Sequence, residues 1–252
     1  MLKTFLGLVV SIMFFLPAHS SSKFVKSVKY PTEIVHSKKS RLSSIEKRSQ
    51  EATVKVIHED SHGYGTGTYF TFNKFHIVIT AAHVVVDKKR LLIQTPKGTG
   101  QLGHVIYKSP EHIDIAILVT HKIPDRTPIP LNNMRSPTNL LGAPIVYSGF
   151  PNNHDLMLIR GSIAGYERDD DTLLAQSYAW MGASGSGVFD RRTGQFVGVL
   201  SAIDVGMAYY PQLVESIVWV SPSWHINRKE LSTILQNFQI ITDGENTAEN
   251  KE

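Results

Sequence analysis

Short apolar runs separated by turn residues recur along the chain between residues 52 and 220. They are rich in β-branched and aromatic residues, and each is three to seven residues long. We expect strands at residues 53–57, 66–72, 76–80, 91–94, 115–119, 145–148, 156–159, 173–175, 187–189, 196–200 and 217–220. Many short strands at this spacing are typical of an all-β sandwich or barrel. A stretch with four prolines, near residues 121–137, indicates a connection between two halves.

The helix that the pattern predicts lies near the C-terminus. Asn227 followed three residues later by Glu230 is a capping-box pattern. An apolar stripe at helical spacing accompanies it, formed by Ile226, Leu231, Ile234, Leu235 and Phe238. We expect this stripe to dock on the body of the protein. The polar, acidic tail at residues 241–252 is expected to be disordered.

Residues 1–20 have the features of an export signal. Lys3 precedes an apolar run at 5–16, and Pro17 and the small-residue pattern Ala18-His19-Ser20 follow it. This run of 12 residues is shorter than the roughly 20 that span a bilayer. We expect cleavage and a secreted or periplasmic protein without a stable membrane span, and an uncleaved membrane anchor is the alternative.

The basic character of the chain, whose pI is about 9.1, is concentrated in residues 21–51. This segment has eight Lys or Arg against three acids, whereas residues 52–240 carry a net charge of only +1. We interpret 21–51 as a flexible leader or propeptide before a domain at 52–240, with tethering to anionic polymers as the alternative. The chain has no cysteine, which excludes disulfides, thiol catalysis and cysteine-ligated metals.

Three local patterns place reactive side chains beside predicted strands. The sequence TAAH at residues 80–83 ends in His83 just after a strand. The sequence DIAIL at 114–118 sets Asp114 before an apolar run, where a carboxylate without a partner is costly. The sequence GASGSG at 182–187 surrounds Ser184 with glycines just before another strand.

These three patterns, in the order His, Asp, Ser, resemble the motifs of the trypsin-like serine peptidases. Their spacings of 31 and 70 residues fit compact bacterial or viral members. The sequences GYGTG at 63–67, GFP at 149–151 and QS at 176–177 are similar to the HtrA branch, and residues 184–189 are similar to glutamyl endopeptidases. The resemblance covers about residues 51–220. It implies two six-stranded antiparallel β-barrels, a C-terminal helix and a polypeptide substrate.

The resemblance also assigns roles to these residues. A serine hydroxyl is a weak nucleophile, so His83 would take the proton of Ser184, and Asp114 would orient the imidazole and stabilise its charged form. The backbone N–H groups of Gly182 and Ser184 would form the oxyanion hole. These roles follow the general template for such triads.

The same register implies a substrate pocket for the residue before the scissile bond. Tyr178 would form its base, and Ser201, Ala202 and Ile203 one wall. Tyr178 offers no carboxylate for a basic side chain, and Leu200 stands where glutamyl endopeptidases have a histidine. We therefore expect a preference for small or medium apolar residues.

Other functions fit the sequence less well. Neither Ser184 nor Ser186 satisfies the G-x-S-x-G elbow of an α/β-hydrolase. His58 and His62 flank two acids but are more simply a solvated turn, so we expect no metal there. The peptidase interpretation implies no cofactor, and because the basic charge lies mainly in residues 21–51, we expect no nucleic-acid partner. The rival hypothesis is a catalytically silent binding or scaffold protein on the same fold.

Overall fold

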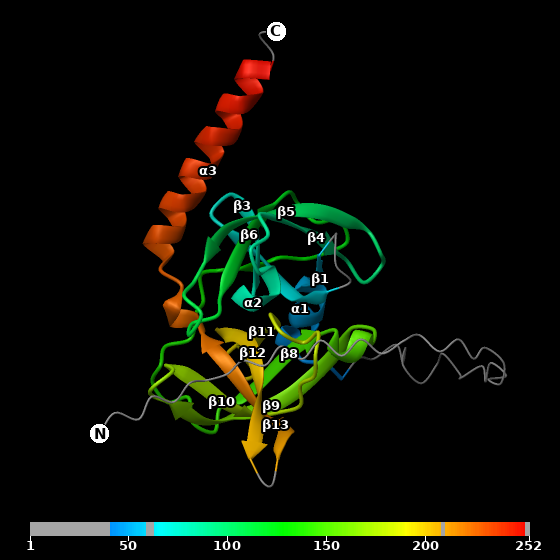
Figure 1. Cartoon of the computed structure of the whole chain (residues 1–252), viewed down its shortest axis with the longest axis vertical. Helices are drawn as coiled ribbons and strands as arrows, with labels where there is room; N and C mark the ends of the chain where they lie inside the picture. Colours follow the sequence, from blue (N-terminus) through cyan, green and yellow to red (C-terminus); the bar gives the residue numbers. More distant parts are fainter. Residues whose placement is uncertain (1–40, 59–62, 208–209, 250–252) are drawn as a thin grey trace, which may run out of the picture. The chain divides into compact units, whose positions relative to one another are not determined.

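The structure is a computed structural model that describes residues 41–58, 63–207 and 210–249 (Figure 1). The expected export signal at 1–20 and most of the expected leader lie outside these residues. Within the described chain, no helix is both long enough and apolar enough to cross a membrane.

The first barrel contains six antiparallel strands. Around the ring they are β1 (Thr53–Ile57), β4 (Arg90–Gln94), β5 (Gly100–Lys108), β6 (Ala116–Thr120), β3 (Phe75–Thr80) and β2 (Tyr64–Phe72). Pairing of β1 with β2 closes the ring, and β7 (Ile129–Pro130) adds a short parallel partner to β2. Alternate side chains point inward, as the two-residue period of a strand requires, and fill the core with residues such as Val54, Val56, Ile77, Ile79, Leu91 and Ile93.

The second barrel is also closed and six-stranded. Its order is β10 (Thr172–Gln176), β13 (Pro211–Pro222), β12 (Phe196–Met207), β11 (Gly187–Asp190), β8 (Pro144–Gly149) and β9 (Met157–Glu167). Its core includes Ile145, Tyr147, Val188, Val197, Leu200 and Val218, all at most 1% exposed. The expected pair of six-stranded antiparallel barrels is therefore confirmed.

The sequence pattern does not predict strands β5 and β7, or the long hairpin at the ends of β12 and β13. β5 mixes glycine and polar residues with apolar ones, and Gly103 is its one buried residue, so it shows no clear alternation. β7 is only two residues long. β12 and β13 extend well beyond the expected 196–200 and 217–220 as an exposed hairpin, whose sequence has no buried face to reveal it.

The expectation of a flexible leader through residue 51 is wrong for its last part. Residues Ser44–Ala52 form helix α1, which runs directly into β1. A capping box begins the helix: the Glu46 N–H donates to the Ser43 hydroxyl, and the Ser43 N–H donates to the Glu46 carboxylate. Ile45 and Ser49 are buried. The many basic residues of 21–51 favour a flexible leader, so the sequence did not predict the buried face of α1.

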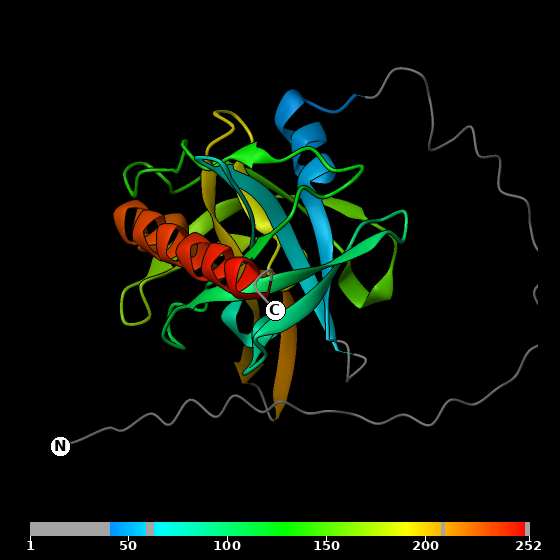
Figure 2. The same cartoon turned by 90° about the horizontal axis from the view of Figure 1, so that it is seen from above.

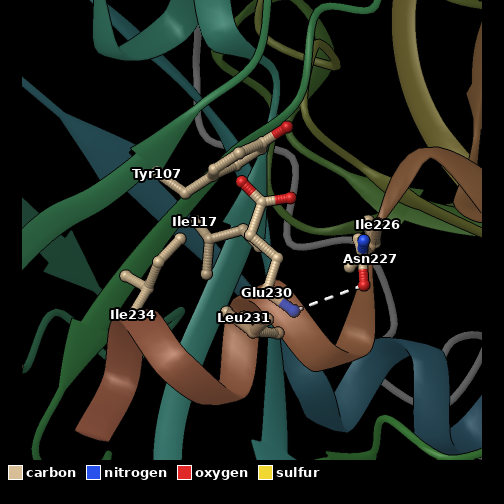
Figure 3. Close-up of a pocket in the computed structure, with 7 residues that line it drawn as sticks. All are labelled: Tyr107, Ile117, Ile226, Asn227, Glu230, Leu231 and Ile234. Carbon is tan, nitrogen blue, oxygen red and sulfur yellow. Dashed lines mark hydrogen bonds between the residues drawn. The ribbon is translucent and has the colours of Figure 1, made fainter. Parts of the chain in front are cut away.

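Helix α3 (Arg228–Glu249) begins as the sequence predicts. The Asn227 side chain accepts hydrogen bonds from the backbone N–H groups of Lys229 and Glu230, at 3.0 and 3.3 Å. The apolar stripe packs on the first barrel, as expected. Three of its residues, Ile226, Leu231 and Ile234, line a recess together with Tyr107 and Ile117 (Figure 3). The helix continues to Glu249, into residues 241–252, for which the sequence predicts a disordered tail. In Figure 2, α3 is seen obliquely, in orange to red, with its C-terminal end marked.

Candidate active site

His83 and Asp114 meet on the first barrel. His83 lies in the single turn α2 (Ala82–Val85) after β3, and Asp114 lies just before β6. Asp114 Oδ2 is 2.8 Å from His83 Nδ1, and Asp114 Oδ1 accepts the His83 backbone N–H at 2.8 Å. Both carboxylate oxygens thus bind one residue, which fixes the imidazole relative to the carboxylate and leaves Nε2 for other partners.

A serine of the second barrel completes the surroundings of Asp114. The hydroxyl of Ser201, on β12, donates a hydrogen bond to Asp114 Oδ2. Asp114 is 9% exposed, so this extra donor lowers the cost of keeping a charge there. The sequence suggested Ser201 only as part of a pocket wall, because no local pattern reveals a contact between two barrels.

Ser184 lies beside this group, in the loop between β10 and β11. Its hydroxyl donates to the Ser201 backbone carbonyl at 3.4 Å, and no described residue other than Ser201 receives it. An O–H···O distance of 3.4 Å is long, so this bond is weak. The structure thus brings Ser184 to the residue that contacts Asp114, without a direct bond to His83.

The loop that carries Ser184 needs its glycines. Gly182 and Gly185 have φ angles of 95° and 91°, which L side chains rarely adopt. A Cβ on Gly185 would lie 2.0 Å from the Thr66 carbonyl oxygen, and one on Gly182 would lie 2.5 Å from that of Phe150. The glycines that made the motif recognisable are therefore required by the backbone and by close packing.

The two N–H groups expected to form the oxyanion hole have no acceptor among the described residues. Ala183, Gly185 and Ser186 each donate their N–H to a carbonyl at 2.7–3.0 Å. The N–H groups of Gly182 and Ser184 donate to no group in the described chain. Because buried backbone donors are nearly always paired, two free donors beside a serine form a natural site for a negatively charged oxygen.

Thr66 of the first barrel anchors the same loop. Its hydroxyl donates to the Gly182 carbonyl at 2.7 Å and accepts the Phe150 N–H at 3.1 Å. Its backbone N–H donates to the Ser184 carbonyl at 2.8 Å, and its carbonyl accepts the Thr80 hydroxyl at 2.7 Å. Thr66 is fully buried, and sequence reasoning missed its role although it lies within the GYGTG motif.

The residues expected to form the substrate pocket do not all face an enclosed space. Tyr178, which the sequence predicts at the base of the pocket, is 41% exposed. Its backbone carbonyl accepts the hydroxyl of Tyr147, whose pKa is raised by burial. Ser201 and Ile203 are partly buried, and Ala202 is exposed.

The described residues contain no cluster of three or more His, Cys, Asp or Glu side chains that could hold a metal ion. The His58 ring instead contacts the Val84 carbonyl, and the other members of the sequence cluster, residues 59–62, lie outside the described chain.

Comparisons with solved structures reveal similar folds at low sequence identity. A serine endoprotease from Yersinia pestis aligns over 79% of this chain and 66% of its own, with 20% identity and a TM-score of 0.57. An inactive mutant form of Rv3671c from M. tuberculosis H37Rv aligns over 77% and 89%, with 19% identity and a TM-score of 0.56. The HtrA-type protease AlgW with tripeptide aligns over 71% and 59%, with 14% identity and a TM-score of 0.56. This chain thus spans about two thirds or less of two of these structures.

A family model, described as the trypsin-like peptidase domain, matches residues 65–199. That range covers more than half of the chain and contains His83, Asp114 and Ser184. No curated protein matches. The chain therefore belongs to the trypsin-like peptidases, a family of peptide-bond hydrolases.

Proposed function

We propose that this chain is a serine endopeptidase in which Ser184 attacks the peptide carbonyl. The observation that carries the proposal is that both oxygens of the Asp114 carboxylate contact His83. This pair lies beside Ser184, whose loop has two backbone N–H groups, of Gly182 and Ser184, that donate to no described group. A scaffold without chemistry has no need of this combination. It supplies in one place a base, an orienting carboxylate and stabilisation for an anion.

The arrangement supports the following reaction. His83 Nε2 accepts the hydroxyl proton as Ser184 Oγ bonds to the carbonyl carbon, and the N–H groups of Gly182 and Ser184 bind the resulting oxyanion. The imidazolium then gives its proton to the leaving amine as the C–N bond breaks, leaving an acyl-enzyme. A water molecule then loses a proton to His83 Nε2 as its oxygen attacks the ester carbonyl, and His83 returns that proton to Ser184 Oγ as the ester bond breaks and the acid is released. Asp114 orients the imidazole and stabilises the imidazolium.

Before Ser184 attacks a substrate, its hydroxyl must leave the Ser201 carbonyl and turn towards His83. Because that bond is weak, rotation about the Cα–Cβ bond of Ser184 can release its hydroxyl towards His83 at small cost. Catalytic hydrogen bonds are often long without substrate and tighten once it binds. The lack of a direct bond between Ser184 and His83 among the described contacts is what favours the rival, a catalytically silent binding protein.

The finer assignments are part of the proposal. Small or medium apolar residues are expected before the scissile bond, since Tyr178 brings no charge and Ile203 adds bulk beside Ser201. The apolar run and small-residue pattern within residues 1–20 support secretion or a periplasmic location.

Labelling with a fluorophosphonate probe, followed by peptide mapping, separates the enzyme from the silent scaffold. We expect the probe on Ser184, and loss of both labelling and peptide hydrolysis, by about 10⁴-fold or more, in Ser184→Ala. Ser186→Ala is the matched control, because Ser186 is buried and donates to the Ala183 carbonyl at 2.6 Å. A folded wild-type protein that takes up no probe would favour the scaffold.

A further inference from the structure

A recess of about 120 Å³ lies between helix α1, the connection that links the two barrels, and the start of β12. Figure 1 shows α1 at the level where the barrels meet, and the Ser49 hydroxyl of this helix donates to the Ser148 hydroxyl of β8 at 3.0 Å. His83, Asp114 and Ser184 do not line the recess. It is therefore separate from the candidate active site.

The floor of the recess is apolar and fixed in place. Four residues that are each at most 4% exposed form it: Ile129, Leu131, Phe189 and Phe196. The connection above this floor is bonded to both barrels. The Leu131 N–H donates to the Thr71 carbonyl, and the Phe196 N–H donates to the Asn133 carbonyl, both at 2.9 Å. The recess is thus preformed, as small-molecule sites usually are.

The rim of the recess is polar and carries one positive charge. Arg48, Asn132 and Asn133 line it with exposed side chains. Within the part of the chain that the structure describes, none of these three side chains has a hydrogen-bond or ion-pair partner. Glu46, on the same helix as Arg48, pairs with Arg160 and Arg191 instead. The rim therefore offers a guanidinium and two amides as donors for a ligand.

The carboxylate of Asp190, which follows Phe189 in the chain, does not line the recess. It is fully buried, and its Oδ1 accepts the backbone N–H groups of Arg192 and Thr193 at 2.8 and 3.0 Å. Its Oδ2 lies 3.5 Å from Arg135 Nε. Because other groups hold both oxygens, Asp190 does not neutralise the charge of Arg48.

We propose that this recess binds a small carboxylic acid, with its carboxylate on Arg48 and the two asparagines and its apolar group on Phe189 and Phe196. A carboxylate matches the planar fork of a guanidinium with two parallel hydrogen bonds. A bare phosphate or sulfate would leave the apolar floor uncovered. The proposal does not depend on the proposed function.

The volume of the recess limits the size of the acid. One benzene molecule occupies an apolar cavity of about 150 Å³, and drug-sized ligands need roughly 300 Å³ or more. A recess of about 120 Å³ thus suits a branched group of a few carbons. Such a group with a carboxylate is found in a free short-chain acid and in the last residue of a polypeptide.

The test is a titration of ¹⁵N-labelled Ser184→Ala protein with 3-methylbutanoate, followed by NMR. We expect saturable shifts at the backbone amides of Gly194, which lines the recess, and of Phe196. The neutral analogue 3-methylbutanamide and the smaller acid acetate should each bind about tenfold more weakly. The first loses a charge-assisted hydrogen bond, and the second buries less apolar surface.

The matched variants, made in the same Ser184→Ala protein, are Arg48→Gln and the control Lys47→Gln. Lys47 is exposed on the same helix and does not line the recess. We expect Arg48→Gln to weaken binding of 3-methylbutanoate about tenfold and Lys47→Gln to change it less than about twofold. Thermal unfolding without ligand verifies that both variants are folded. Equal affinity of Arg48→Gln and its parent would overturn the proposal.

The free N–H groups of Gly182 and Ser184 offer a second place for a carboxylate, so the position of the shifts decides between the two sites. Shifts confined to Gly182 and Ser184, and unchanged by Arg48→Gln, reject the recess. The peptide Gly-Gly-Leu and its C-terminal amide separate the two sources of the acid. Shifts at Gly194 with the acid peptide but not with the amide support a chain end as the ligand, and shifts with 3-methylbutanoate alone support a free acid. No shift at Gly194 or Phe196 with either acid overturns the proposal, whether or not the wild-type protein cleaves peptides.

Discussion

Helix α1 carries Glu46, whose carboxylate contacts the second barrel, whereas the helix itself runs into β1 of the first barrel. Glu46 is 1% exposed, and its Oε1 lies 2.6 Å from Arg160 Nε and 3.0 Å from Arg191 Nε. Arg160 belongs to β9 of the second barrel, whereas α1 runs directly into β1 of the first. Replacing Glu46 should therefore weaken a contact on which the packing of α1 depends.

The size of the effect follows from the ionisation of Glu46. Its hydrogen bond with Arg160 is the largest cause that lowers its pKa from 4.5 to about 2. A pKa lowered by this much means that folding favours the ionised form of Glu46 over its protonated form by about 3 kcal/mol. The side chains of Arg160 and Arg191 are 49% and 44% exposed, so solvent screening reduces the contribution to about 1–2 kcal/mol.

The sign of the pH dependence is set by the lowered pKa. The folded state favours ionised Glu46, so the contribution is complete above about pH 4.5 and disappears as the pH falls towards 2. Glu46→Gln should lower the free energy of unfolding by about 1–2 kcal/mol at pH 7. The difference between wild type and Glu46→Gln should shrink steadily between pH 4.5 and 2.

Urea unfolding, followed by tryptophan fluorescence and circular dichroism at several pH values, measures this difference. Glu51→Gln is the matched control, because Glu51 lies on the same helix with an exposed side chain. We expect the control to differ from wild type by less than about 0.5 kcal/mol at all pH values. If Glu46→Gln matches wild type at pH 7, or if its deficit stays constant down to pH 2, the reasoning about this ion pair is wrong.

The remaining predictions concern the candidate site. Asp114→Asn should lower kcat by several orders of magnitude, because the His83 imidazole loses the carboxylate that orients it; a fully active variant in a kinetic assay would contradict this. Gly185→Ala should destabilise the fold by about 2 kcal/mol or more and abolish activity, because its Cβ would meet the Thr66 carbonyl; thermal unfolding with a kinetic assay tests this. Thr66→Val should cost about 1–3 kcal/mol and lower kcat more than it raises KM, since the loop with the two free N–H donors loses its anchor; unchanged kinetics would exclude that role.

Local patterns in the sequence were sufficient for most strands, and they singled out His83 and Asp114, which the structure places in contact. The strand at 53–57 was predicted to the residue, because alternation of apolar and polar side chains is a property of neighbouring positions. Asn227 marked the start of α3 for a similar reason, since a helix cap acts within one turn. The glycines around Ser184 were informative because positive φ angles and close packing leave few other choices.

Contacts between distant segments were decided only by the tertiary structure. Ser201 reaches Asp114 across 87 positions of sequence, and Arg160 reaches Glu46 across 114, so no local pattern could reveal either pair. The exposure of Tyr178 likewise depends on how the loop after β10 packs, which its sequence does not encode locally. The periodicity of a strand or helix and the residues of a turn are local features, so they can be predicted from the sequence. The partner of a buried charge or hydroxyl depends on how the two barrels pack together.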